Sequence, residues 1–273
     1  MFRWVADVGR GDWIRPRLGP FGSGVGSVVP RGFEAYTRVL HRAADRGITA
    51  VRWAQVAATT GTVLHPTAQW SQVARRGQPG EWPGGDPVEG ALDHEQLTAL
   101  VGLLRGFTDP DTVTAAFWNG SSWEGGRLLA TAWAEGRTPL WRVPPLRRLA
   151  AARRMRQGPP TGPDIDPAVL ASPRLELPAR EYILLAGALD DVATLATGTA
   201  TADVAPFRPG DRTPSLLWPD DHSWCVATEV DLDSTLVGGP DALIDAVLAD
   251  ATLEAFGVSQ DDRLGAFDDE VNR

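Results

Sequence analysis

The residues with the clearest potential for chemistry lie between positions 218 and 239. This segment, WPDDHSWCVATEVDLDSTLVGG, contains five carboxylates within twenty-two residues. The alternation over 223–233 predicts a strand with Glu229, Asp231 and Asp233 on one face, spaced about 6.5 to 7 Å apart. Carboxylate oxygens are the ligands that Mg²⁺ and Ca²⁺ prefer, and a carboxylate pair can also supply a general acid and base.

Two interpretations of this carboxylate row compete. With Asp220 and Asp221 in the preceding turn, the row would hold a divalent cation for a metal-dependent hydrolase. Alternatively, the row is the exposed face of an amphipathic strand, whose charges serve solubility or protect a sheet edge. Three like charges on an exposed strand need no metal, so the pattern favours the second interpretation and no cofactor is expected.

His222 and Cys225 have the residue types of a base and a nucleophile, since thiolate chemistry needs an adjacent imidazole. On an extended strand, residues three apart point to opposite faces. The spacing therefore predicts a small buried cysteine instead of a nucleophile. Because the chain has one cysteine, an internal disulfide and cysteine-based metal cages are excluded.

The other histidines and glycines match none of the common catalytic motifs. His41, His65 and His94 lack the spacing of a zinc motif and are expected to be structural or surface residues, although zinc held by scattered histidines and acids stays open. The glycines at 22–26 lack the rest of a phosphate-binding loop, and GSSWE at 120–124 fails the serine-hydrolase pattern. Serine hydrolases, Walker-type NTPases, kinases and Rossmann enzymes therefore all lack their defining residues here.

Tryptophan is unusually abundant, with 11 residues in the chain. Aromatic walls beside carboxylates are typical of sugar sites and cation cages, and tryptophan is enriched in protein-binding hot spots. Core packing is the simpler interpretation. One group clusters in sequence: Trp118, Trp123, Trp133 and Trp141. The candidate ligand- or partner-binding residues are those of the acidic segment: Trp218, Asp220, Asp221, His222, Trp224, Glu229, Asp231 and Asp233.

The charge of the chain is asymmetric. Its 273 residues include 26 arginines and no lysine, and the net charge is −9. Residues 1–202 have 22 arginines and 19 acids, whereas residues 203–273 have 4 arginines and 16 acids. An acidic chain repels nucleic acid phosphates, so we expect no nucleic acid partner and instead a protein with a basic surface. The basic stretch 137–156 reads as a helix after Pro144 and Pro145, and we expect a solvated helix face that can dock on the acidic part, with an anionic ligand site as the alternative.

No apolar run approaches the roughly 18 residues of a membrane span, and the first residues lack the apolar region of a signal peptide. We therefore expect a cytoplasmic protein without membrane association.

Apolar periodicity predicts helices over 33–46, 93–105 and 239–257, and a short helix over 190–196. The second is the clearest, because Asp93 is a good N-cap, Gln96 follows three residues later, and Leu92 and Leu97 can form a hydrophobic staple.

Strands are predicted over 112–118, 181–189 and 223–233, and a surface loop over 206–219. The irregular order of helices and strands indicates an α+β fold, a mainly antiparallel sheet with packed helices in one or two lobes. The proline- and glycine-rich stretch 158–167 is read as a linker or loop. It separates a helix-rich α+β lobe, 1–157, from an acidic α+β lobe, 168–273.

The stretch WPDDHSWCVATEVDLDSTLVGGPDALIDAVL, with VVPRGFEAYTRVLH and VRWAQVAATTG upstream, resembles an uncharacterised (hypothetical) protein family of high-GC bacteria over most of 13–257. This resemblance implies no catalytic residue. A fainter similarity is to the SMI1/KNR4-like immunity superfamily, whose members are α+β partner-binding proteins.

These observations favour a non-catalytic protein-binding module of an immunity-like kind, which would use its tryptophan-bearing loops and acidic part to engage a partner. Two alternatives stay open: a divalent-metal-dependent hydrolase that uses the carboxylates of 220–233, and a small-molecule sensor with a tryptophan-lined pocket.

Overall fold

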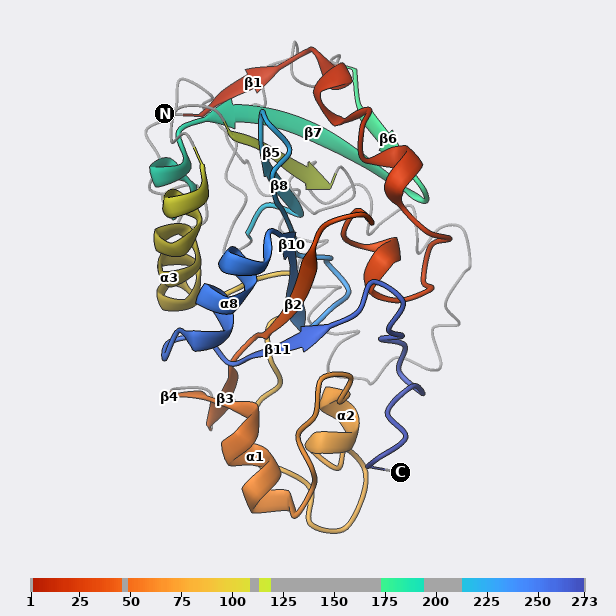
Figure 1. The fold of residues 1–273 in the computed structure, drawn as a ribbon. Helices are drawn as coiled ribbons and strands as arrows, with labels where there is room; N and C mark the ends of the chain where they lie inside the picture. Colours follow the sequence, from red (N-terminus) through yellow and green to blue (C-terminus); the bar gives the residue numbers. More distant parts are fainter. Residues whose placement is uncertain (1, 46–48, 109–112, 119–172, 194–212, 273) are drawn as a thin grey trace, which may run out of the picture.

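A computed structural model describes residues 2–45, 49–108, 113–118, 173–193 and 213–272. In these ranges the chain is an α+β protein built on a nine-stranded sheet, with a second, two-stranded sheet near one end (Figure 1). Every strand pair is antiparallel, which confirms the predicted fold class.

The large sheet has the order β1-β7-β5-β8-β9-β10-β2-β11, and β6 also pairs with β7. Its strands are β1 (Arg3–Val5), β2 (Ala35–Leu40), β5 (Val113–Trp118), β6 (Leu175–Leu177), β7 (Arg180–Gly187), β8 (Leu216–Pro219), β9 (Cys225–Ala227), β10 (Ser234–Gly239) and β11 (Ala255–Val258). The small sheet consists of β3 (Ala43–Asp45) and β4 (Thr49–Val51). Strands from 1–157 and from 168–273 are interleaved in this order, so both ranges contribute to one sheet.

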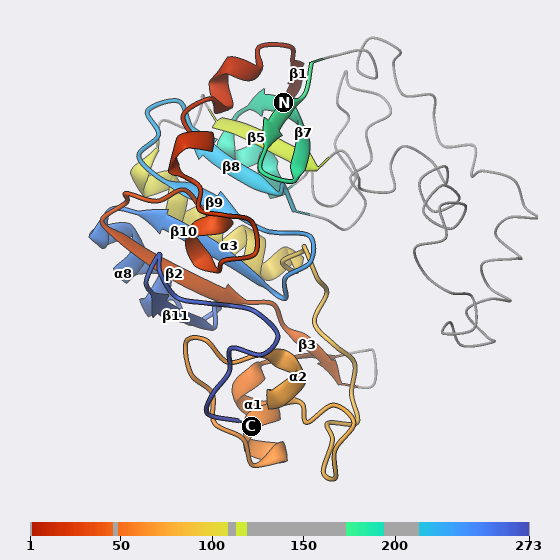
Figure 2. The same ribbon diagram turned by 90° about the vertical axis from the view of Figure 1, so that its right-hand side faces the viewer.

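Two helices, α3 (His94–Leu104) and α8 (Asp241–Ala249), cover one face of the large sheet (Figures 1 and 2). Their apolar residues join alternate side chains of the strands in one core. The start of α3 confirms the sequence prediction, because Asp93 accepts a hydrogen bond from the Gln96 amide at 2.8 Å. The side chain of Gln96 does not complete a capping box. It donates instead to the Leu40 carbonyl at the end of β2, at 2.8 Å.

The other face of the sheet is covered by residues 8–33, which contain three 3₁₀ helices: η1 (Val8–Gly11), η2 (Arg15–Arg17) and η3 (Val25–Ser27). Gly24 holds this segment close to the loop after β11. Its φ is +113°, and a Cβ there would lie 2.1 Å from the Asp262 carbonyl oxygen. Glycine is therefore required by both conformation and space. Two further 3₁₀ turns are η4 (Arg105–Phe107) and η7 (Leu189–Asp191).

A third, smaller core lies below the sheet around α1 (Trp53–Thr60) and α2 (Trp70–Val73) (Figure 1). The carboxylate of Glu254 accepts hydrogen bonds from the amides of Trp53 and Ala54, at 2.7 and 2.9 Å. These amides are the first donors of α1 and have no partner within the helix. Glu254, which precedes β11, thus caps α1 and joins this small core to the sheet.

The predicted helix over 33–46 is wrong. Residues 35–40 form β2, which pairs with β10 on one side and with β11 on the other, and 43–45 form β3. Tyr36 and Val39 face different cores, so both sides of β2 are buried. In a segment that is apolar on both sides, the spacing of apolar residues does not distinguish a strand from a helix. The strands that pair with β2 are also remote in sequence.

Other boundaries also differ from the prediction. The helix over 239–257 is shorter, because Gly239 belongs to β10, Pro240 is the N-cap and 255–258 form β11. Of the strand over 223–233, only Cys225–Ala227 is extended in the sheet. Leu216–Pro219 is a sheet strand and not part of a surface loop.

The strands over 112–118 and 181–189 are confirmed as β5 and β7. Where a helix is predicted over 190–196, the structure begins with a 3₁₀ turn, η7. Residues 194–196 of that predicted range lie outside the described residues. The predicted linker 158–167, the basic stretch 137–156 and three tryptophans lie outside them: Trp123, Trp133 and Trp141. Within the described ranges, no helix has the length and apolar character of a membrane span.

Candidate functional site

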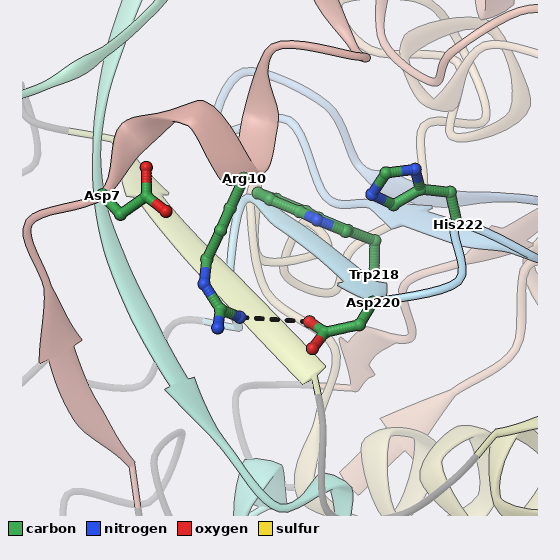
Figure 3. A pocket seen from close by; sticks show the side chains of 5 residues that line it. All are labelled: Asp7, Arg10, Trp218, Asp220 and His222. Carbon is green, nitrogen blue, oxygen red and sulfur yellow. Dashed lines mark hydrogen bonds and ion pairs between the residues drawn. The ribbon is translucent and has the colours of Figure 1, made fainter.

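A hollow of about 290 Å³ lies where the N-terminal segment meets the turn between β8 and β9 (Figure 3). We call it the Trp218 hollow. Five residues line it: Asp7, Arg10, Trp218, Asp220 and His222. Three of them were candidate binding residues in the sequence, so the structure brings Trp218, Asp220 and His222 together.

The N-terminal wall of the Trp218 hollow is formed by η1. Asp7 is the N-cap of η1, and its Oδ1 accepts a hydrogen bond from the Gly9 amide at 3.0 Å. Arg10 donates from one terminal nitrogen to Asp220 Oδ1 at 3.0 Å and to Thr114 Oγ1 at 3.3 Å. Arg10 therefore pairs with Oδ1 of Asp220, whose side chain stays 47% exposed, whereas no arginine of the described residues pairs with Asp7.

The opposite wall is the turn after β8. Trp218 is 1% exposed and closes the floor of the hollow. His222 stacks on Trp13, with ring centroids 4.5 Å apart and an interplanar angle of 17°. His222 has φ +56°, in the left-handed region, which histidine tolerates better than most residues. Asp221 supports this turn by accepting a hydrogen bond from the Ser223 amide at 3.0 Å.

The surroundings of His222 favour the neutral form of its imidazole. Partial burial lowers its pKa below the usual 6.5, and the nearby Arg17 guanidinium lowers it further, against the opposing effect of Asp221 and Asp220. The five lining residues thus have two carboxylates, one guanidinium and two planar rings, a formal charge of −1, and Arg17 lies outside this lining, over Trp13. Such a site is suited to a cation, because the carboxylates outnumber the arginine and the rings offer polarisable surface.

The predicted carboxylate row does not form. Glu229 and Asp231 lie in the loop between β9 and β10, and each has an oxygen 2.5 Å from a terminal nitrogen of Arg180. The guanidinium of Arg180 also lies over Trp118, 4.5 Å from the ring centroid. Its burial opposes the charge, but the two carboxylates outweigh this and raise the pKa of Arg180.

Asp233 belongs to a different contact, 3.2 Å from the buried Arg38. Burial raises the pKa of Asp233 above its usual value, and Arg38 offsets only part of this shift. The three candidate metal ligands are thus divided between two arginine contacts, and none of them lines the hollow with Trp218. In the part of the chain that the structure describes, no group of three or more histidine, cysteine, aspartate or glutamate side chains is arranged to hold a metal.

Trp224 and Cys225 also lie away from the hollow. Trp224 is buried in the core under α3 and α8, on the opposite face of the sheet from Trp218, and donates to Thr108 Oγ1. Cys225 is fully buried, as the sequence predicts, and burial raises the pKa of its thiol. A protonated, inaccessible thiol does not act as a nucleophile.

The structure adds Asp7, Arg10 and Trp13 to the site. Their sequence, DVGRGDW, has no motif beyond an aspartate that can cap a turn. Arg10 and Asp220 are separated by 210 residues, and only the packing of residues 8–33 on the sheet joins them. The spacing of neighbouring residues in the sequence does not predict a contact between positions so far apart.

A second polar cluster surrounds Asp269, whose side chain is fully buried. Asp269 accepts hydrogen bonds from His65 Nε2 at 2.9 Å, from the Gln69 amide at 3.2 Å and from Asn272 Nδ2 at 2.9 Å. Burial opposes the ionised form, but these hydrogen bonds outweigh it and lower the pKa of Asp269 to about 2. Asn272 in turn bonds both backbone groups of Val63 at 2.8 Å. The cluster fastens the last described residues to the loop before α2.

Replacing Asp269 with alanine is expected to release this segment, because several buried donors lose their shared acceptor at once. We expect a loss of about 2 kcal/mol in the free energy of unfolding, together with faster proteolysis after Arg263. Urea denaturation and limited trypsin digestion measure the two effects. Asp261→Ala is the control, since its partner Arg31 and the Asp261 side chain, 68% exposed, form only a surface pair. Equal behaviour of the two variants would contradict the anchoring role of Asp269.

No protein-family model, curated protein or solved structure matches this chain. The geometry of the Trp218 hollow therefore carries the functional argument.

Proposed function

We propose that this protein is a non-catalytic binding module for a protein partner with a basic surface, and that the Trp218 hollow accepts one basic side chain of that partner. The observation that carries the proposal is the pair of carboxylates, Asp7 and Asp220, on a ring-lined hollow with Arg10 as the only described cation in its lining. A cationic group fits this charge balance better than an anion or a neutral ligand does.

The size of the hollow favours a single side chain over a whole small molecule. Ligand pockets usually enclose about 300 to 1,000 Å³, and the Trp218 hollow, at about 290 Å³, lies below that range. A side chain presented by a partner needs no deep enclosure, because the surrounding surfaces contribute the remaining contacts. This is why we prefer a protein partner to the small-molecule sensor.

The acidic composition of the C-terminal part of the chain supports the same choice. Residues 203–273 have 16 acids against 4 arginines, and Asp220 remains 47% exposed beside Arg10. Opposite charges on a partner speed association and orient the encounter. The faint resemblance to partner-binding immunity proteins agrees with this proposal. The hydrolase has no comparable support, since Glu229, Asp231 and Asp233 are paired with arginines.

A short acetylated and amidated peptide of alternating glycine and arginine is expected to bind the full chain, and binding should weaken at high salt. Asp7→Asn and Asp220→Asn should each weaken binding about fivefold, the equivalent of about 1 kcal/mol for one screened charge contact. Asparagine still accepts the hydrogen bonds of η1 and of Arg10, so the local structure is kept. Titration followed by tryptophan emission and by the imidazole resonances of His222 measures the affinity.

Asp245→Asn is the matched control, because it removes the same charge from the exposed face of α8. It should leave the affinity within error of the unchanged protein. The proposal is overturned if the peptide does not bind at millimolar concentration, or if Asp245→Asn weakens binding as much as the two hollow variants do.

A further inference from the structure

Three arginines of the protein share one arrangement. In each, the guanidinium carbon lies 4.5–5.9 Å from the centroid of a tryptophan ring. In each, a terminal nitrogen also lies 2.5–3.2 Å from a carboxylate oxygen. The sets are Arg38 with Trp53 and Asp233, Arg76 with Trp70 and Asp86, and Arg180 with Trp118, Glu229 and Asp231.

The chemistry of guanidinium explains this repetition. A planar guanidinium can lie flat on an aromatic ring while its edge donates to carboxylates, whereas an ammonium is a compact, strongly hydrated charge. Rings combined with carboxylates are therefore the environment in which arginine gains most over lysine.

The Trp218 hollow also combines carboxylates with planar rings, and the arginine stacked beside it, Arg17, lies over Trp13, 5.3 Å from the ring centroid. Two carboxylates and two planar rings border it, and within the described ranges no guanidinium lies over the Trp218 ring. Arg10 engages Oδ1 of Asp220 through one terminal nitrogen, so Oδ2 of Asp220 is left for another donor. Because Trp218 is almost fully buried, the ring we consider for stacking is that of His222, which packs on Trp13 with one face and also lines the hollow.

We infer that the basic side chain taken by the Trp218 hollow is an arginine, whose guanidinium stacks on His222 and pairs with Asp7 and Asp220. This inference rests on the proposed function and specifies the chemistry of its ligand. The partner's arginine completes in trans the arrangement that Arg38, Arg76 and Arg180 form within the chain. His222 is accordingly the residue that distinguishes arginine from lysine, while the two aspartates attract either cation.

Three peptides test this inference, identical except for arginine, lysine or citrulline at one central position. Citrulline keeps the planar shape of arginine but lacks its charge. On the unchanged full chain, the arginine peptide should bind about fivefold more tightly than the lysine peptide, and the citrulline peptide most weakly. His222→Asn should reduce the arginine-to-lysine ratio to about one, since asparagine tolerates the left-handed backbone but offers no ring.

His94→Asn is the control, because His94 is exposed on α3 and its substitution should leave the ratio unchanged. Equal binding of the arginine and lysine peptides, with both weakened by Asp7→Asn, overturns the arginine inference and leaves the proposed function standing. Failure of every basic peptide to bind overturns the proposed function itself. The ratio of the affinities for the arginine and lysine peptides, measured on the unchanged protein, tests the inference by itself. The test therefore does not depend on the stability of His222→Asn.

Discussion

Replacing Arg38 with alanine is expected to lower the free energy of unfolding by about 3 to 5 kcal/mol. Arg38 is 1% exposed in β2, and its guanidinium donates to Ser234 Oγ, to the carbonyls of Pro66 and Ala68, and to Asp233. Without it, a largely buried carboxylate and several buried acceptors lose their donor together. Denaturation in urea, followed by tryptophan emission, measures the change.

Two further variants separate the buried pair from a general effect of losing an arginine. Arg105→Ala removes an ion pair with Asp190 whose side chains are 55% and 56% exposed, and should cost less than about 1 kcal/mol. Adding Asp233→Asn to Arg38→Ala should recover part of the loss, because the unpaired charge is removed. If Arg38→Ala and Arg105→Ala cost the same, the energetic role assigned to the Arg38 pair is wrong.

Acidification from pH 6.5 to pH 4 is expected to remove about 3 kcal/mol of stability through His41 alone. Burial lowers the pKa of His41 to about 4, against an ordinary value of 6.5. Over this interval the unfolded chain binds a proton that the folded protein does not, so the unfolded state gains stability as the pH falls. Well above pH 6.5 the ring is neutral in both states, and well below pH 4 it is protonated in both, so most of the loss falls between these two values.

The contacts of His41 explain why the neutral ring is favoured. Nδ1 lies 2.8 Å from the Val88 carbonyl oxygen and Nε2 lies 2.9 Å from Thr235 Oγ1. We assign the proton to Nδ1, which donates to the carbonyl, so that Nε2 accepts from the threonine hydroxyl. A second proton on Nε2 would place a charge in the core and force the hydroxyl of Thr235 to turn away.

The free energy of unfolding of the unchanged protein and of His41→Asn, measured from pH 7 to pH 4, isolates this effect. The variant should start less stable but lose about 3 kcal/mol less on acidification. His94→Asn, at an exposed position, should keep the pH dependence of the unchanged protein. A parallel decline of the unchanged protein and His41→Asn would show that His41 does not control acid stability.

Several of the abundant tryptophans and arginines contact one another in the structure. Trp53, Trp70 and Trp118 each have an arginine guanidinium over the ring. Trp53 and Trp70 are buried while Trp118 is half-buried, so core packing and cation binding are combined in the same residues. Arginine suits this role because it remains charged when buried and stacks through its plane.

Features whose causes are local could be predicted from the sequence. Helix α3 begins where Asp93 caps the Gln96 amide, and this contact involves residues three apart. The strands β5 and β7 were indicated by short apolar runs of strand length, and both are interior strands of the sheet. The burial of Cys225 was predicted from its spacing to His222, because residues three apart on a strand point to opposite faces and the pair could not act as nucleophile and base.

Features that depend on partners remote in the chain could not be predicted from the sequence. Residues 35–40 form a strand because β10 and β11 supply hydrogen bonds on both sides, and that pairing outweighs the helical spacing of the apolar residues. The carboxylates of 220–233 look equivalent in sequence. Arg180 and Arg38 take up three of them, and Asp220 borders a hollow whose other wall comes from residues 7–10.

The α+β class, the capped helix α3 and the segment in which to look for a site follow from the amino-acid sequence, because composition, caps and short-range periodicity act between neighbours in the chain. Which acidic residues remain open to a ligand depends instead on the folding of remote segments against one another. Charge pairing depends on distance in space, and the contacts of Arg10, Arg38 and Arg180 with their carboxylates span 210, 195 and 49 to 51 residues of chain.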